Sequence, residues 1–170
     1  MKPLRQPIMS TVYLLTGSNL GHSAAYLAEA ASQIEQKLGK IVRRSSLYET
    51  EPWGNTNQPA FLNQVLVLET EFEPEPLMRL LLEVETNMGR KRTEKYGPRT
   101  IDIDQLFYEN KVYNSDILVL PHHQIQNRRF VLVPLQEVAP QLIHPLLHKT
   151  ITELLDTCTD YSSVQKKLLL

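Results

Sequence analysis

Apolar residues recur with helical spacing in two segments of the chain. From Ser23 to Leu38 they follow the i, i+3, i+4, i+7 pattern of a helix face, and Gly39 follows as a helix stop. The second segment follows Glu73–Pro76, where acidic residues and prolines favour the start of a helix. Each pattern predicts an amphipathic helix with one side against a core. The apolar positions of the second helix are Leu77, Leu80, Leu81, Val84 and Met88.

Short runs rich in β-branched and aromatic residues flank these helices and predict strands. They lie at Thr11–Thr16, Ile41–Tyr48, Leu62–Thr70 and Thr100–Tyr108, with a hairpin through Glu109-Asn110 into Val112-Tyr113. The order up to Tyr108 is strand, helix, strand, strand, helix, strand. This order predicts an α+β fold, a ferredoxin-like βαββαβ sandwich with an extra C-terminal strand. Short helical pieces are expected near Phe130–Val138 and Thr152–Cys158.

Length and composition are typical of one folded domain. The chain has 170 residues, 42% of them hydrophobic, which excludes a wholly disordered protein. We expect a single domain over residues 1–170 with flexible ends at 1–10 and 162–170. The only cysteine, Cys158, cannot form an intrachain disulfide, and no apolar run approaches the roughly 20 residues of a membrane helix. A cytoplasmic monomer without membrane contact is the expectation.

Charge is distributed unevenly along the chain. The net charge is only −1, which argues against a general nucleic-acid binder. The loop Gly89–Arg99, however, holds five basic side chains and one acid, a local charge of +4, so the remainder carries −5. Arginine guanidinium groups bind phosphate oxygens in pairs of hydrogen bonds. The loop therefore fits a phosphate site, a solvated basic loop or a nucleic-acid patch.

Two aspartates directly after this loop change that balance. Asp102 and Asp104 alternate with Ile101 and Ile103, so on a strand the aspartates share one face and the isoleucines point into the core. Their Cα atoms would lie about 6.6 Å apart, and such carboxylates suit hard cations such as Mg²⁺. Alone, the pair would be read as a solvated strand face. Beside the basic loop, it favours a polyphosphate carrying Mg²⁺.

Aromatic residues and histidines form two weaker signals. Trp53, Phe61 and Asn63 could stack on a flat heterocycle and hydrogen-bond its edge, although aromatic residues at a strand start are more often core. His122-His123 lacks a third ligand for zinc, so hydrogen bonding or plain surface exposure are the alternatives.

Several ordered motifs together are similar to one enzyme family. From Val12 to about Leu155 the chain resembles the 6-hydroxymethyl-7,8-dihydropterin pyrophosphokinases. The matching blocks are Gly17–Gly21, Ser46–Gly54, Gln58–Asn63, Gly89–Arg92, Gly97–Asp104, Pro121-His122 and Asn127–Phe130. The resemblance implies a ferredoxin-like core and transfer of pyrophosphate from ATP to the pterin hydroxymethyl group, with release of AMP, in folate biosynthesis.

The resemblance also implies roles for individual residues. Asp102 and Asp104 would hold two Mg²⁺ ions, and together with Arg90, Arg92 and Arg99 they would form the catalytic group. Nucleotide contacts are implied for Arg90, Arg92, Tyr96, Arg99, Ile103, His122 and Arg128. Pterin contacts are implied for Thr50, Glu51, Trp53, Phe61, Asn63 and Phe130, with Phe61 and Phe130 as the stacking pair. Four positions depart from common members of the family: Glu51, Leu82, Tyr96 and His123.

Two other functions remain open at this point. An RNA-binding module can share the same order of elements, but it needs exposed aromatic residues on its central strands, which Val65–Leu68 does not supply. A regulatory domain that binds a nucleotide without chemistry would have no need of the aspartate pair. Pterin-dependent release of AMP from ATP separates the enzyme from both.

Overall fold

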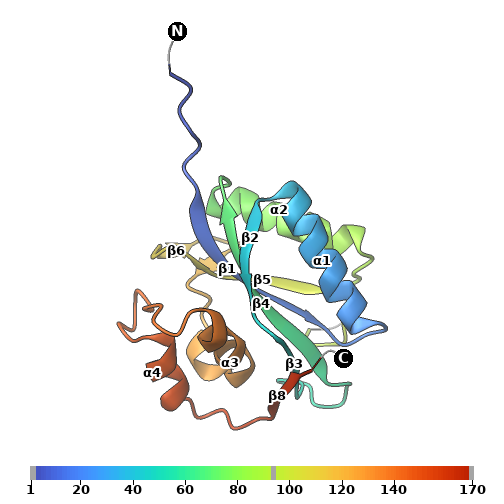
Figure 1. Cartoon of the computed structure of the whole chain (residues 1–170). Helices are drawn as coiled ribbons and strands as arrows, with labels where there is room; N and C mark the ends of the chain where they lie inside the picture. The colour runs from blue at the N-terminus through green and yellow to red at the C-terminus, as the bar shows by residue number, and fades with distance from the viewer. Residues whose placement is uncertain (1–2, 93–94, 169–170) are drawn as a thin grey trace.

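A six-stranded antiparallel sheet runs through the centre of the fold, with strand order β5-β1-β4-β3-β8 and β2 also paired to β4 (Figure 1). The computed structural model describes residues 3–92 and 95–168. The strands are β1 (Ser10–Ser18), β2 (Lys40–Arg44), β3 (Leu47–Thr50), β4 (Phe61–Thr70), β5 (Asp102–Tyr108) and β8 (Val164–Lys167). The helices are α1 (Ser23–Lys37), α2 (Pro74–Asn87), α3 (Arg129–Val138) and α4 (Ile151–Asp156). The predicted ferredoxin-like α+β fold is confirmed.

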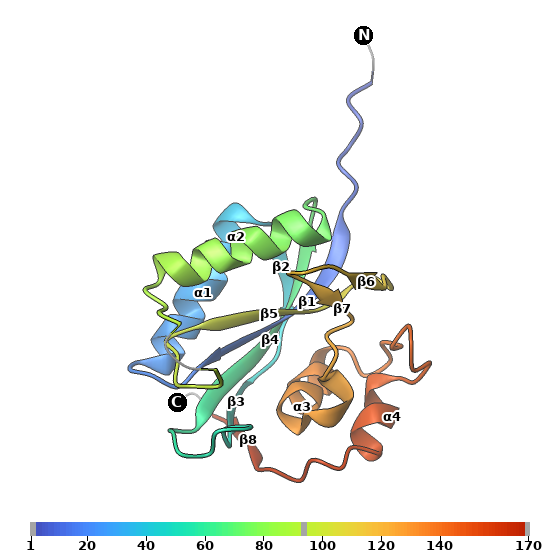
Figure 2. The ribbon, with the colours of Figure 1, turned by 180° about the vertical axis from the view of Figure 1, so that it is seen from behind.

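Helices cover both faces of the sheet, so its central strands are buried on two sides. Helices α1 and α2 lie on one face, and α3 and α4 on the other (Figure 2). Side chains alternate between the two cores: Val12 and Leu14 of β1 pack under α1 and α2, and Tyr13 and Leu15 pack toward α3. Burial on both faces explains why β1 reads as a continuous apolar run.

One predicted strand is wrong in its extent. The segment Ile41–Tyr48 forms two strands, β2 and β3, with a break at Ser45-Ser46. Ser45 donates its backbone N–H to the Val65 carbonyl at 2.9 Å, and its hydroxyl accepts the Val65 N–H at 2.9 Å. This exchange replaces regular strand pairing and turns the chain between the two strands. The strand predicted from Thr100 begins two residues later, at Asp102.

Two further expectations about the second half need correction. The predicted hairpin partner of β5 instead pairs elsewhere: β6 (Tyr113–Asn114) pairs with β7 (Val119–Leu120) in a small separate sheet. The tail 162–170, expected to be a flexible end, contains β8, which pairs with β3 from Leu47 to Thr50. Residues 1–2 and 169–170 lie outside the described residues, and residues 3–9 form no helix or strand and extend away from the sheet (Figure 1).

The short helical connector η1 (Ile125–Asn127) leads into α3, which carries Phe130 near its first turn. Asp160 accepts the Arg129 N–H at 2.9 Å and so satisfies a free donor at the start of this helix. The loop before β8 therefore fixes the start of α3.

Candidate active site

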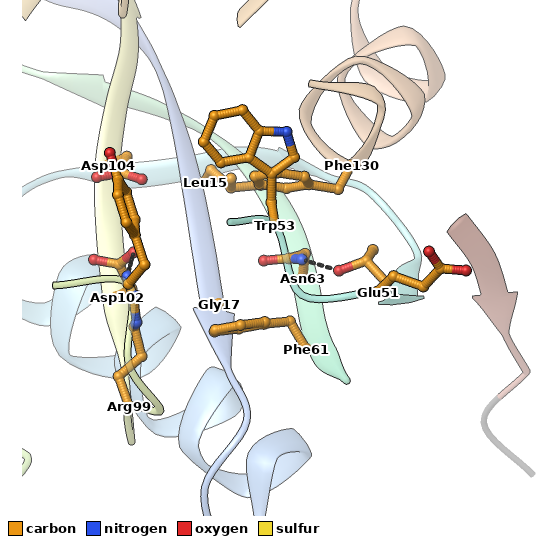
Figure 3. Close-up of a pocket in the computed structure, with 12 residues that line it drawn as sticks. Leu15, Gly17, Glu51, Trp53, Phe61, Asn63, Arg99, Asp102, Asp104 and Phe130 are labelled. Atoms are coloured by element: carbon orange, nitrogen blue, oxygen red, sulfur yellow. Dashed lines mark hydrogen bonds and ion pairs between the residues drawn. The ribbon is translucent and has the colours of Figure 1, made fainter. Parts of the chain in front are cut away.

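Three adjacent strands bring two predicted site residues, Asn63 and Asp102, into one row with Gly17. In the sheet register, Gly17 of β1 is opposite Asn63 of β4 on one side and opposite Asp102 of β5 on the other. Paired residues of antiparallel strands project to the same face, here the face of α3. Leu15 pairs with Asp104 one row further along. Figure 3 shows the aspartates and Asn63 on opposite sides of β1.

Gly17 provides the space between these groups because it has no side chain. A Cβ atom at this position would lie 2.5 Å from Asn63 Oδ1, well inside contact distance. The floor of the pocket is therefore backbone, with the Asn63 amide on one side and the carboxylates on the other.

Asp102 is held by two arginines from the basic loop. Arg90 Nη1 lies 2.7 Å from Asp102 Oδ1, and Arg99 Nη1 lies 2.9 Å from Asp102 Oδ2. These two cations keep the pKa of Asp102 below its usual range despite burial, so the carboxylate is ionised. Arg99 also donates from Nε and Nη2 to the Gly97 carbonyl, which orders the end of the loop.

Asp104 has the opposite electrostatic surroundings. Burial, followed by the negative charges of Asp102 and Glu85, raises the pKa of Asp104 to about 8, and Arg128 and Arg99 only partly offset this. Asp104 thus lies near two other acidic groups, and the nearby arginines do not fully compensate the negative charge around it. Such a group gains from a bound cation.

Glu85, in the last turn of α2, is a site residue that the sequence reasoning missed. Its side chain is 3% exposed. Its Oε1 accepts the Ile103 N–H at 2.7 Å and lies 3.1 Å from Arg90 Nη1, and its Oε2 lies 3.3 Å from Arg92 Nη2. Burial and the charge of Asp102 raise the pKa of Glu85 to about 7. The sequence offered one sign of this role: Glu85 lies four residues after Leu81, on the apolar side of the helix.

Aromatic side chains line the other half of the pocket. Phe61 from β4 and Phe130 from α3 lie on either side of the Asn63 side chain, and Trp53 lies in front of Phe130 (Figure 3). Asn63 Nδ2 donates to Thr50 Oγ1 at 2.7 Å, which fixes the direction of the amide. This arrangement brings together the predicted pterin residues, including Glu51, whose N–H donates to the Ser163 carbonyl at 3.2 Å.

The arginine side and the aromatic side of the site are in contact, because two guanidinium groups pack against aromatic rings. The guanidinium carbon of Arg99 lies 5.4 Å from the Phe61 ring centre, and that of Arg128 lies 4.5 Å from the Trp53 ring centre. Tyr96, predicted on the nucleotide side, packs edge-on against Trp53 at 6.2 Å and so borders both halves.

Two residues with predicted nucleotide contacts, Ile103 and His122, do not line the pocket between the aspartates and the rings. Ile103 is buried in the core as its alternation predicts, and its N–H is bound to Glu85, so its contact with a nucleotide stays a prediction. His122 accepts the Gln124 N–H at Nδ1, and burial, together with Arg128, lowers the pKa of His122 to about 4. The imidazole is therefore neutral, with Nε2–H as its free donor. His123 is exposed and stacks on it at 4.9 Å.

The residues that could hold a metal are Asp102 and Asp104. Within residues 3–92 and 95–168, no three His, Cys, Asp or Glu side chains gather as a complete metal site. Two carboxylates on one strand face suit an ion that takes its remaining ligands from a substrate and water. In the same described ranges, no helix is long and apolar enough to cross a membrane.

Comparison with known proteins gives a consistent result. Residues 13–140 match the family model described as 7,8-dihydro-6-hydroxymethylpterin-pyrophosphokinase. The chain is 45% identical over 136 residues to the 2-amino-4-hydroxy-6-hydroxymethyldihydropteridine pyrophosphokinase of Methylorubrum extorquens, covering 79% of this chain and 86% of that protein. The Aquifex aeolicus protein of the same name is 41% identical, with 85% and 90% covered.

A solved structure shares the fold. The crystal structure of Plasmodium falciparum HPPK-DHPS wild type superposes with a TM-score of 0.68 at 18% identity, over 89% of this chain and 42% of that one. The chain thus spans less than half of that solved protein, and the likeness concerns the fold alone. The sequence relatives and the family model are decisive: this chain belongs to the 7,8-dihydro-6-hydroxymethylpterin-pyrophosphokinase family.

Proposed function

We propose that the two halves of the site divide the two substrates of the family reaction, transfer of a pyrophosphoryl group from ATP to hydroxymethyldihydropterin in folate biosynthesis. ATP occupies the arginine side, and the pterin lies among the aromatic rings. The observation that carries this assignment is the row Asn63, Gly17 and Asp102 across three strands. It sets a ring-binding amide beside a carboxylate suited to a phosphate-bound cation.

On the arginine side, the basic loop supplies the triphosphate contacts. Arg90, Arg92 and Arg99 pair with carboxylates of the chain and can exchange them for phosphate oxygens. Arg128 Nε is buried and has no hydrogen-bond partner among the described residues, as expected of a donor awaiting an anion. Neutral His122 adds a donor without a charge. Tyr96 would cover the nucleotide from the loop.

Asp102 and Asp104 fit Mg²⁺, because their site is rich in carboxylate charge and open to a phosphate-bearing substrate. Two ions bound there with ATP would neutralise charge on the triphosphate and polarise the bridging oxygens. The role of the aspartates is to fix that charge beside the acceptor pocket.

On the ring side, the chain positions the acceptor. Phe61 and Phe130 stack on the two faces of the pterin, while Asn63 and the Thr50 region bind its polar edge and Trp53 covers it. The hydroxymethyl oxygen then points across Gly17 toward the β-phosphorus, and AMP leaves in line. The protein contributes mainly orientation and charge neutralisation, which is what this class of transfer requires.

The decisive measurement is pterin-dependent AMP release from ATP and Mg²⁺. We expect AMP only when all three are present, and loss of the product after Asp102→Ala. AMP formation without the pterin, or full activity of the Asp102→Ala variant, would refute the assignment. Because one chain supplies every group invoked, we propose that the monomer is the active unit; the cytoplasm as its compartment stays a prediction from the sequence.

A further inference from the structure

One buried carboxylate connects three elements behind the arginine side of the site. Glu85 belongs to α2, Arg90 and Arg92 belong to the basic loop, and Ile103 belongs to β5. The two carboxylate oxygens of Glu85 lie within 3.3 Å of a nitrogen atom of each of the other three residues. Glu85 does not line the pocket that holds Asn63 and the rings.

Packing alone does not explain an acidic residue at this position. The neighbouring residues on the same helix face, Leu81 and Val84, are apolar and buried, and a third apolar residue would continue their packing against the core. Glu85 instead places a carboxyl group beside Asp102, where burial, followed by the negative charge of Asp102, raises the pKa of Glu85 to about 7. Buried charge is costly unless it is well paired, so its partners indicate its role.

The partner on β5 is the backbone between the two aspartates. The Ile103 N–H donates to Glu85 Oε1 at 2.7 Å, which fixes the strand at the residue separating Asp102 from Asp104. The spacing and direction of the two carboxylates therefore depend on this hydrogen bond.

The partners on the loop are the arginines that pair with carboxylates in the free protein. Arg90 Nη1 lies between Glu85 Oε1 at 3.1 Å and Asp102 Oδ1 at 2.7 Å. If Asp102 exchanges this arginine for a cation, Glu85 remains as its second partner. Arg92 is 66% exposed, and Glu85 at 3.3 Å is its ion-pair partner among the described residues.

We propose that Glu85 is a positioning residue for the ATP half of the site. It holds Arg90 and Arg92 toward the triphosphate and fixes β5 between Asp102 and Asp104 while those carboxylates change partners. The proposal deepens the proposed function and rests on it, because it takes Asp102 and Asp104 as the metal-binding pair.

The test compares Glu85→Gln with Glu83→Gln, a matched change at an exposed glutamate of the same helix. Gln keeps an oxygen for the Ile103 N–H but removes the carboxylate that pairs with Arg90 and Arg92. We expect the KM for ATP to rise about tenfold or more, as for loss of a charge-assisted hydrogen bond, with a lower kcat. The Kd of the pterin, measured by fluorescence, should stay within about twofold, since Glu85 does not touch its pocket. Glu83→Gln should resemble the unaltered enzyme.

A purely structural role would give a different result. Equal weakening of both substrates, or kinetics unchanged by Glu85→Gln, would overturn the proposal. If Glu85→Gln fails to fold, Glu85→Asp gives the same reading: it keeps the charge but is one methylene too short to reach all three partners, so the KM for ATP should rise while the pterin Kd holds.

Arg92→Ala supplies a second, independent reading on an exposed residue. Its effect on the KM for ATP should be much smaller in the Glu85→Gln background than in the unaltered enzyme, because Glu85→Gln has already removed the ion pair that positions Arg92. Equal effects in both backgrounds would count against the proposal. Unaltered enzyme lacking pterin-dependent AMP release would instead remove the proposed function, so the two failures are separable.

Discussion

The two halves of the site are held together by different forces. On the arginine side, Arg90, Arg92 and Arg99 are paired with Glu85 or Asp102, and under the proposed function they would exchange these partners for phosphate oxygens. On the ring side, the interactions are a neutral Asn63–Thr50 hydrogen bond and the contacts of guanidinium groups with the Phe61 and Trp53 rings. The proposed function therefore requires ion pairs to rearrange on the arginine side but not on the ring side.

This difference has an energetic consequence. When an arginine releases an internal carboxylate, it forms a similar charge-assisted hydrogen bond to a phosphate oxygen, so ATP binding is close to an exchange of equivalent bonds. Pterin binding, in contrast, would add stacking and burial without breaking an ion pair. Added salt should weaken the first half more than the second, because screening acts on charges and not on ring stacking.

The strongest test of this division is Asp102→Asn. Removing the charge should lower kcat/KM by about a thousandfold or more, since charge neutralisation is the main contribution of the protein to this chemistry. Pterin affinity should change less than about threefold, because neutral hydrogen bonds and rings hold it. Steady-state AMP release and fluorescence titration measure the two effects. Asp116→Asn, at an exposed aspartate, is the control.

Arg99→Ala should affect both halves at once. Its guanidinium pairs with Asp102 and also lies over the Phe61 ring. We expect roughly a hundredfold loss in kcat/KM for ATP and a smaller, about fivefold loss in pterin affinity, following the relative strength of ion pairs and cation–ring interactions. A selective loss of ATP binding alone would mean that the halves are independent. Arg79→Ala, on the exposed side of α2, is the matched control.

Asn63→Ala should give the converse of Asp102→Asn. Loss of the amide removes hydrogen bonds to the pterin edge and leaves Thr50 without its partner, which should weaken pterin binding about tenfold. The KM for ATP should hold within a factor of about two. Asn87→Ala, at an exposed asparagine, controls for the substitution itself. Parallel loss of ATP affinity would contradict the division of the site.

Asp104→Asn should stabilise the substrate-free protein. The pKa of Asp104 in the folded protein, about 8, lies above the ordinary value of 3.8. The free energy of unfolding therefore falls as the pH rises from about 4 to 8, and the full destabilisation by the ionised carboxylate is present above pH 8. The melting temperature of the variant should exceed that of the unaltered protein by a few degrees at pH 8.5. The gap should narrow at pH 5.5. A constant gap would point to packing instead of charge.

Much of the fold follows from local patterns. Helical spacing located α1 and α2 within a residue or two, because each buries one continuous apolar stripe. Alternation from Ile101 to Asp104 correctly separated the two isoleucines in the core from the aspartates on the other face. The proximity of Asp102 and Asn63 came from the resemblance and could not come from spacing, since it depends on the register around Gly17.

Other features depend on interactions between distant segments. The break at Ser45 is imposed by Val65, 20 residues away, and leaves no local turn signal. Strand β8 is formed by pairing with β3, although its sequence has little apolar character. Glu85 was recognisable only as an acid on an apolar stripe. Its partners become visible once α2, the loop and β5 are packed together.

Strand β8 also covers the edge of the sheet that β3 would otherwise expose. Without it, β3 would offer open N–H and carbonyl groups to any passing strand, next to the loop that carries Trp53. With it in place, the outermost strand carries Lys166 and Lys167, and Lys167 is paired with Glu49 at 2.9 Å. Positive charge at the sheet border discourages edge-to-edge stacking of identical chains. We therefore expect β8 to disfavour edge-to-edge association beside the pocket that Trp53 and Phe61 line.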